Sequence, residues 1–169
     1  NVYDTILMRK DDEPDNIYIL WTAFIDDQYF RLYRIFNIKT EKLGDIKVNR
    51  FKVGDTVNDF STSGMKNALA INGIGYKEMR SDIGIMQKLT SRNENGVTYY
   101  YTGAYSGNFN CIIKSCDLIT WEYVAQPDEG EGAFRNDTLW ENAVYVLDDK
   151  AYYFIRQWQA SIDDEGKPI

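Results

Sequence analysis

The sequence has no histidine among its 169 residues and only two cysteines. The lack of histidine excludes catalytic triads and dyads that use an imidazole base, and it argues against an ordinary zinc site. Any chemistry must therefore rely on carboxylates, tyrosines, arginines or lysines. We accordingly expect neither a metal nor a cofactor.

Basic residues are also scarce. There are 19 of them against 26 acidic residues, which gives a formal net charge of −7. A nucleic-acid partner would require a basic surface, so nucleic-acid binding is not expected. No apolar run approaches the length of a membrane-spanning helix, and no membrane span is expected either. The two cysteines, Cys111 and Cys116, stand on opposite faces of one strand and its exit, which disfavours a disulfide between them.

What the sequence does contain is aromatic and β-branched residues in short runs, separated by turn residues. Aromatic residues make up 15% of the chain, led by thirteen tyrosines. Runs of this kind, bounded by Asp, Asn, Pro and Gly, predict strands. The predicted strands fall into two groups of four and a final pair: residues 4–10, 17–24, 29–36 and 45–53; residues 82–88, 97–105, 109–115 and 120–124; and residues 141–147 and 150–158.

The groups of four predict an all-β fold, a β-propeller of four-stranded antiparallel blades. The openings of the first two groups, DTILMRK and DIGIMQK, share Asp, Met and Lys at the same three positions. About two and a half blades are present, which cannot close a ring, so we expect the remaining blades as partners. The expected boundaries are a blade at 1–58, a helical insertion at 59–80, a blade at 81–125, a loop at 126–138 and an incomplete blade at 139–169.

Each group of strands opens with an acidic residue: Asp4, Asp82 and Glu141. First strands of successive blades line the central channel of a propeller, so these carboxylates would meet at one mouth. Closely spaced acids separate into acid and base roles, and paired carboxylates are the usual means of cleaving glycosidic bonds. The alternative is that an Asp before a strand is simply turn chemistry.

The last predicted hairpin suggests a second feature. A two-residue turn at Asp148-Asp149 pairs residues whose numbers add up to 297, which places Glu141 opposite Arg156. Directly opposed residues share a face, so a carboxylate and a guanidinium would meet there. Arg80, just before the second group, would add a positive charge to the same rim. The plain alternative is a cross-strand ion pair on a solvated edge.

The stretch SCDLITW, residues 115–121, is similar to the Asp-box of the sialidase superfamily, S-x-D-x-G-x-T-W, although it lacks the Gly and is one residue shorter. The shorter form resembles the blade motif of arabinanase-like and fructosidase-like five-bladed glycosidases. In both, the motif is structural: its Asp holds a turn and its Trp packs into the blade. The sialidase resemblance extends to Glu141 and Arg156, since a Glu and a carboxylate-binding Arg fifteen residues later are typical of that family.

These resemblances imply a carbohydrate-active, secreted or periplasmic protein whose partner is a glycan. Three functions stay open. The first is an exo-acting sialidase-like glycoside hydrolase with Glu141 as the base for a tyrosine nucleophile and Arg156 as the carboxylate ligand. The second is an arabinanase-like hydrolase that uses Asp4, Asp82 and Glu141. The third is a glycan-binding propeller without catalysis. We expect the 169-residue chain alone to be inactive in each case.

Overall fold

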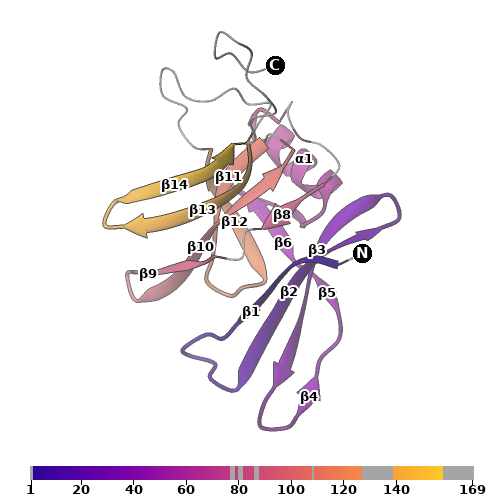
Figure 1. Cartoon of the computed structure of the whole chain (residues 1–169), viewed down its shortest axis with the longest axis vertical. Helices are drawn as coiled ribbons and strands as arrows, with labels where there is room; N and C mark the ends of the chain where they lie inside the picture. The colour runs from indigo at the N-terminus through magenta and orange to yellow at the C-terminus, as the bar shows by residue number, and fades with distance from the viewer. Residues whose placement is uncertain are drawn as a thin grey trace, which may run out of the picture.

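The computed structural model describes residues 2–76, 79, 82–85, 88–107, 109–126 and 139–157. For residues 139–141, 156 and 157 it describes the backbone only. Within these ranges the protein is all-β with one short helix, as the strand patterns predict. Its sheets are curled and give the molecule the shape of a half-barrel (Figure 1).

The first sheet is an antiparallel meander. Its central strand is β2 (Asn16–Ile25), which pairs on one side with β1 (Val2–Met8) and on the other with β3 (Gln28–Asn37). Two short strands, β4 (Lys42–Leu43) and β5 (Lys47–Val48), then pair with β3 one after the other. The order of strands in the sheet therefore follows the order of the sequence.

The second sheet is larger and forms the middle of the molecule. Its order is β7 (Thr56–Asp59), β6 (Arg50–Val53), β12 (Thr120–Ala125), β11 (Phe109–Ser115), β10 (Val97–Ser106) and β8 (Gly84–Ile85). Strand β9 (Thr90–Glu94) also pairs with β10. All pairings are antiparallel except that of β6 with β12, which is parallel.

The strand predicted at 45–53 is divided between the two sheets. Residues 47 and 48 pair with β3, whereas β6 pairs with β12. The break falls at Asn49, which is fully buried and whose Nδ2 donates to the carbonyl oxygens of Leu118 and Ile119 at 3.1 and 3.0 Å. A distant backbone segment thus competes successfully with the local pairing. The stretch between the strands predicted at 82–88 and 97–105 was expected to be a turn, but β9 (Thr90–Glu94) occupies most of it.

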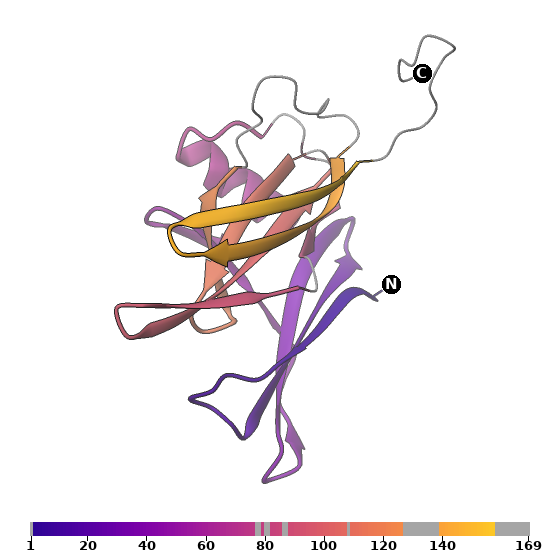
Figure 2. The same ribbon diagram turned by 60° about the vertical axis from the view of Figure 1, so that its left-hand side comes forward.

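The third sheet is the hairpin of β13 (Leu139–Leu147) and β14 (Lys150–Gln157), which lies across β10 and β11 of the middle sheet (Figure 2). The predicted register, in which the numbers of paired residues add up to 297, is confirmed from Leu147 opposite Lys150 to Asn142 opposite Ile155. Every second residue faces the middle sheet. The opposite face is exposed and carries Tyr145, Leu147, Tyr152 and Phe154.

The predicted helix is present as α1 (Thr62–Ile71) between the two large groups of strands. The Ser61 hydroxyl accepts a hydrogen bond from the backbone N–H of Gly64, which caps the first turn, and Asn72 ends the helix. Met65, Ala68 and Leu69 form its buried face. No helical segment in the described part of the chain is long and apolar enough to span a bilayer.

The middle sheet is covered on both faces. On one side a single core joins it to the first sheet and to α1 through fully buried residues: Leu20, Phe51, Phe60, Met65, Leu69, Ile113 and Trp121. On the other side, Tyr101 and Ile112 pack against Val144 of the hairpin. This double coverage explains why β10 and β11 are buried along most of their length, polar residues such as Thr102 and Asn110 included.

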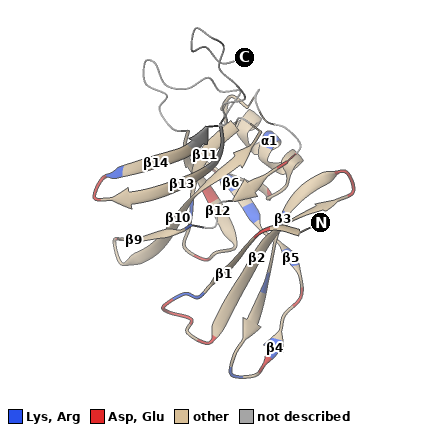
Figure 3. Ribbon diagram, in the orientation of Figure 1, with Lys and Arg blue, Asp and Glu red and all other residues tan. Residues whose placement is uncertain are grey.

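Acidic residues lie mainly in the turns between strands (Figure 3). In the β2–β3 turn, Asp26 and Asp27 both have positive φ, 47° and 61°. Two successive positive φ angles define the type I′ turn, whose twist matches that of the strands, and Asp tolerates it better than most residues. Much of the negative charge therefore serves turn formation.

The SCDLITW stretch is structural, as expected. One carboxylate oxygen of Asp117, Oδ1, accepts hydrogen bonds from the backbone N–H groups of Ile119 and Thr120 at 2.8 and 2.7 Å. The same oxygen accepts one from the hydroxyl of Ser115. Trp121 is fully buried in the main core. The turn thus fixes the start of β12, which carries Trp121 inward.

We predict that Asp117→Ala lowers the free energy of unfolding by about 1–3 kcal/mol, because it leaves two backbone N–H groups of a buried turn without their acceptor. Urea denaturation measures this. Asp117→Asn is the matched control, since its amide oxygen can occupy the same position, and it should restore at least half of the loss. Equal losses in both variants would contradict the role assigned to Oδ1.

Candidate functional site

Asp4 occupies an irregular position in β1. Its φ is 49°, a value that Asp tolerates better than most residues but that is foreign to regular strand geometry, and the register of β1 with β2 shifts between Tyr3 and Ile6. The shift is the signature of a β-bulge, which redirects a side chain and is common beside functional sites. The expected acidic residue at the start of the first strand is therefore presented by distorted backbone.

Arg31, on β3, holds this bulge. Its side chain crosses the face of the first sheet, and Nη1 donates to the carbonyl oxygen of Asp4 at 2.8 Å and to the hydroxyl of Thr22 at 3.1 Å. Thr22 lies directly opposite Arg31 on β2. The backbone of Arg31 bonds in turn to Phe60 and Asn49, where the chain passes between the two large sheets. Arg31 is thus fixed from both its backbone and its side chain.

The guanidinium of Arg31 is withdrawn from water. The residue is 1% exposed, and its Nε and Nη2 have no hydrogen-bond partner among the described residues. Burial lowers the pKa of Arg31 to about 10, while the nearby Asp4 and Tyr105 act in the opposite direction. At neutral pH the group is still a cation, and it sits in a low-dielectric setting where its field is strong.

Tyr105 and Asp82 come from the second group of strands. Tyr105 is directly opposite Gly84 on β8, and its ring lies so close that a Cβ atom at Gly84 would collide with it. Glycine is therefore required at the start of β8, where the tyrosine ring crosses it. Asp82 stands two residues before β8, half-buried. Burial raises the pKa of Tyr29, with smaller contributions from Tyr3 and Asp82, so Asp82 lies near this pair of tyrosines.

The starts of the first two groups are therefore close together. Strand β1 contacts β8. Tyr3, next to Asp4, and Tyr29, near Asp82, have their ring centroids 6.1 Å apart. We refer to this set as the Arg31 cluster, which consists of Asp4, Arg31, Asp82, Tyr105, Tyr3 and Tyr29. It brings together two of the three expected carboxylates with a cation that the sequence reasoning missed.

The third expected carboxylate, Glu141, lies on β13, and Arg156 lies on β14. The predicted register is present up to Asn142 and Ile155, but it shifts between Leu139 and Asn142, at the position of Glu141. The side chains of Glu141 and Arg156 lie outside the described residues, as does the whole of Arg80. Their expected approach to each other stays a prediction.

A buried polar contact fixes the end of the hairpin that bears Glu141. The side-chain amide of Asn142 donates to Oδ1 of Asn110 on β11 at 2.8 Å, and the hydroxyl of Tyr153 donates to the same oxygen at 3.0 Å. Asn142 reaches β10 at Gly103, where a Cβ atom would collide with its side chain. Strand β13 is therefore anchored one residue away from Glu141.

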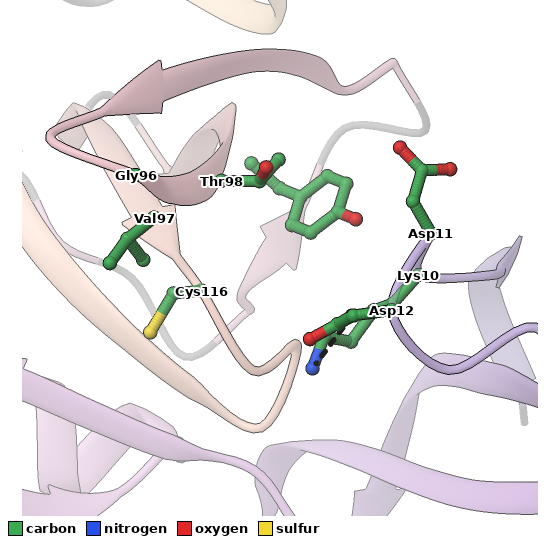
Figure 4. A pocket seen from close by; sticks show the side chains of 8 residues that line it. Lys10, Asp11, Asp12, Gly96, Val97, Thr98 and Cys116 are labelled. Atoms are coloured by element: carbon green, nitrogen blue, oxygen red, sulfur yellow. Dashed lines mark ion pairs between the residues drawn. The ribbon is translucent and has the colours of Figure 1, made fainter.

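A cavity of about 280 Å³ lies at the opposite end of the first strands (Figure 4). It is lined by the turn after β1, with Lys10, Asp11 and Asp12, and by Thr98 and Tyr100 of β10, together with Cys116. Lys10 pairs with Asp12 at 3.4 Å and with Glu13 at 2.7 Å. These pairings keep its ammonium group occupied, so we assign the cavity a structural role at the junction of the two large sheets.

The Arg31 cluster offers no ready metal site. No group of three or more His, Cys, Asp or Glu side chains among the described residues is arranged to hold a metal ion. Its chemistry is that of carboxylates beside a fixed cation and phenols.

Sequence reasoning could have found Arg31 from its position. In the strand YFRLYRIF, it shares a face with Tyr29, Tyr33 and Ile35, all of which pack against the main core. An arginine at a core-facing position is unusual and signals a specific role. Arg34, half-buried on the other face of the same strand, gives no such signal.

Comparison of the chain with protein-family models, with curated proteins and with solved structures found no match.

We predict a pH-dependent contribution from Glu13, beside the cavity of Figure 4. Hydrogen bonds from Lys10, Tyr18 and Asn16 lower the pKa of its carboxyl from 4.5 to about 2. A carboxyl whose pKa is lower in the folded state stabilises the folded state at pH values above its pKa in the unfolded state. For Glu13 this contribution is lost as the pH falls to the folded-state pKa of about 2. Glu13→Gln should therefore cost about 1–2 kcal/mol at pH 7, after allowance for solvent screening.

Urea denaturation between pH 7 and pH 2 tests this. The stabilities of wild type and Glu13→Gln should converge toward pH 2, and Glu41→Gln, at an exposed turn position, should match wild type throughout. A gap between wild type and Glu13→Gln that stays constant over this range would contradict the assignment.

Proposed function

We propose that this chain forms part of a β-propeller glycoside hydrolase in which Asp4, Asp82 and Glu141 are the catalytic carboxylates. The observation that carries the proposal is the arrangement of the first strands. Strand β1 neighbours β8, and β9 neighbours β13. The opening strands of the first two groups therefore lie side by side, the opening strand of the third group lies against β9 and β10 of the second group, and each group opens with an acid. In a propeller this arrangement would direct the three acids toward one channel mouth.

The chemistry suits glycosidic bonds. Such bonds are cleaved by two carboxyl groups, of which one protonates the leaving oxygen while the other, ionised, activates water or attacks the sugar. The role of each is set by its surroundings, because a neighbouring cation keeps one acid ionised and a neighbouring anion or burial keeps another protonated. In the Arg31 cluster, Asp4 lies beside the buried guanidinium and Asp82 lies near the phenols of Tyr3 and Tyr29.

Aromatic rings beside the carboxylates favour a sugar ligand. Phe24 and Tyr3 are both more than two-fifths exposed, and both rings contact Tyr29, with centroid distances of 4.9 and 6.1 Å. An exposed aromatic surface next to polar groups can pack against the apolar face of a sugar ring. We propose a glycan as the substrate class, and by resemblance alone an extracytoplasmic location.

The exposed face of the hairpin supports the expectation of further blades. Two-stranded hairpins are marginal in water on their own, and this one leaves a side with Tyr145, Tyr152 and Phe154 uncovered. Its inner side is already packed on the middle sheet. We propose that another sheet of the propeller covers the outer side, as the hairpin itself covers the middle sheet.

The sialidase-like alternative depends on Glu141 facing Arg156, with Arg80 nearby. The predicted pairing extends as far as the neighbouring residues Asn142 and Ile155, but the register shifts beyond them, where Leu139 lies opposite Gln157. It is kept as the second candidate. In it, Glu141 would be the base for a tyrosine nucleophile and Arg156 would bind the carboxylate of a sialic acid.

We predict that Asp4→Asn, Asp82→Asn and Glu141→Gln each reduce kcat of the complete protein at least about 100-fold, because each removes a proton-transfer or nucleophilic group with little change of shape. Aryl arabinofuranosides, fructosides and sialosides are the substrates to test. Asp11→Asn, at the opposite end of the first strands, is the control and should keep wild-type activity. Wild-type rates in all three variants would refute the assignment of these carboxylates to catalysis, whereas a complete protein that hydrolyses none of these substrates would favour a glycan-binding protein without catalysis.

We predict that Arg156→Lys separates the two enzymatic candidates. Lysine keeps the charge but not the two-pronged geometry that matches a carboxylate. If the substrate is a sialoside, KM should rise by a factor that corresponds to about 1–3 kcal/mol of binding energy. A neutral arabinoside or fructoside should show no such selective loss. An unchanged KM for sialosides in an active enzyme would eliminate the sialidase-like candidate.

A further inference from the structure

The burial of the Arg31 side chain costs free energy, and the hydrogen bonds that it makes do not account for the presence of a charged group. Its guanidinium is almost fully buried, yet only Nη1 is engaged, with the carbonyl of Asp4 and the hydroxyl of Thr22. A neutral amide could hold one carbonyl oxygen without bringing a charge out of water. Burying a cation costs several kcal/mol unless an opposite charge compensates it. The compensating charge is therefore the feature to identify.

The nearest compensating charge is the carboxylate of Asp4. The backbone carbonyl oxygen of the same residue accepts the hydrogen bond from Nη1 of Arg31 at 2.8 Å, so Asp4 lies beside the guanidinium. Asp4 and Tyr105 are the two groups that favour the charged form of Arg31. This coupling is mutual, since a cation that is stabilised by a carboxylate stabilises that carboxylate equally. The positive φ of Asp4 holds the arrangement at the bulge.

We propose that Arg31 is a positioning residue that keeps Asp4 ionised, so that Asp4 is the nucleophile or base of the site and the proton donor is Asp82 or Glu141. The division of roles rests on the proposed function. The statement about the charge of Asp4 does not depend on it.

The charged and titratable groups around Asp4 come from three elements and a segment before a fourth. Tyr3 neighbours it on β1, Arg31 and Tyr29 lie on β3, Tyr105 lies on β10, and Asp82 precedes β8. Among these described groups, Arg31 is the only fixed cation. Asp82 carries a like charge and would disfavour a second ionised carboxylate nearby. The cation therefore decides which of the two acids ionises first.

The test is a direct titration of Asp4. The complete protein is labelled with ¹³C at the aspartate carboxyl carbons, and the signal of Asp4 is assigned by its loss in Asp4→Asn. In wild type, Asp4 should titrate below its ordinary value of about 3.9. In Arg31→Met the midpoint should rise by about one to three pH units, since an opposite charge has been removed. Arg31→Lys, which keeps the charge, should restore most of the difference.

Arg34→Met is the matched control. Arg34 is on the same strand and also bonds a backbone carbonyl, that of Gly44, at 2.9 and 3.1 Å, but at the exposed far end of the sheet. It should leave the titration of Asp4 unchanged. If Arg31 serves only to hold the bulge, Asp4 should titrate alike in wild type and in Arg31→Met. Should neither Arg31 variant fold, an Asp4 that titrates at or above about 3.9 in wild type overturns the proposal.

Hydrolysis provides the second arm. In an active enzyme, the acidic limb of the kcat/KM profile should move to higher pH in Arg31→Met by the same amount as the Asp4 signal, and should not move in Arg34→Met. A protein that hydrolyses no glycoside, but in which Asp4 responds to Arg31 as expected, refutes the proposed function alone. An active enzyme in which Asp4 does not respond refutes the role of Arg31 alone.

Discussion

The double coverage of the middle sheet is the constraint on which the other features depend. Strands β10 and β11 are buried along most of their length on both faces, so a layer of structure lies on each side of them. The first sheet and α1 supply one layer, and the β13–β14 hairpin supplies the other. This stacking places β8 against β1 and holds β13 against β9 and β10. Asp4 and Asp82, at the starts of the first two groups, owe their approach to the packing of aliphatic and aromatic side chains far from them.

In the Arg31 cluster, the surrounding packing maintains two features that are energetically unfavourable. A non-glycine residue with positive φ and a buried cation are each unfavourable by themselves. Both persist because Thr22, Asn49 and Phe60 hold Arg31 from three directions. Local strain is thus maintained by long-range structure. A site of this kind concentrates electrostatic field on Asp4, which an exposed turn such as Asp148-Asp149 cannot do because water screens it.

The features that depend on residues close together in the sequence could be predicted from the sequence. The register of the hairpin followed from the two-residue turn at Asp148, and the helical insertion was expected at 59–80, where α1 lies. The division of residues 45–53 could not be predicted in this way, since Asn49 bonds to carbonyl groups that lie 69 and 70 residues further along the chain. The bulge at Asp4 was hidden for the same reason. Its cause is an arginine two strands away, and no feature of the sequence around Asp4 announces it.

The parallel pairing of β6 with β12 has a consequence for how the molecule is made. Strand β6 precedes β12 in synthesis by nearly 70 residues, as the bond between Asn49 and Leu118 shows. Until β12 emerges from the ribosome, one edge of β6 lacks its partner while the first meander is already complete. Contacts between distant segments form slowly, and an unpaired strand edge invites pairing with other chains. The nascent chain therefore needs protection from aggregation between the synthesis of residue 53 and the synthesis of residue 120.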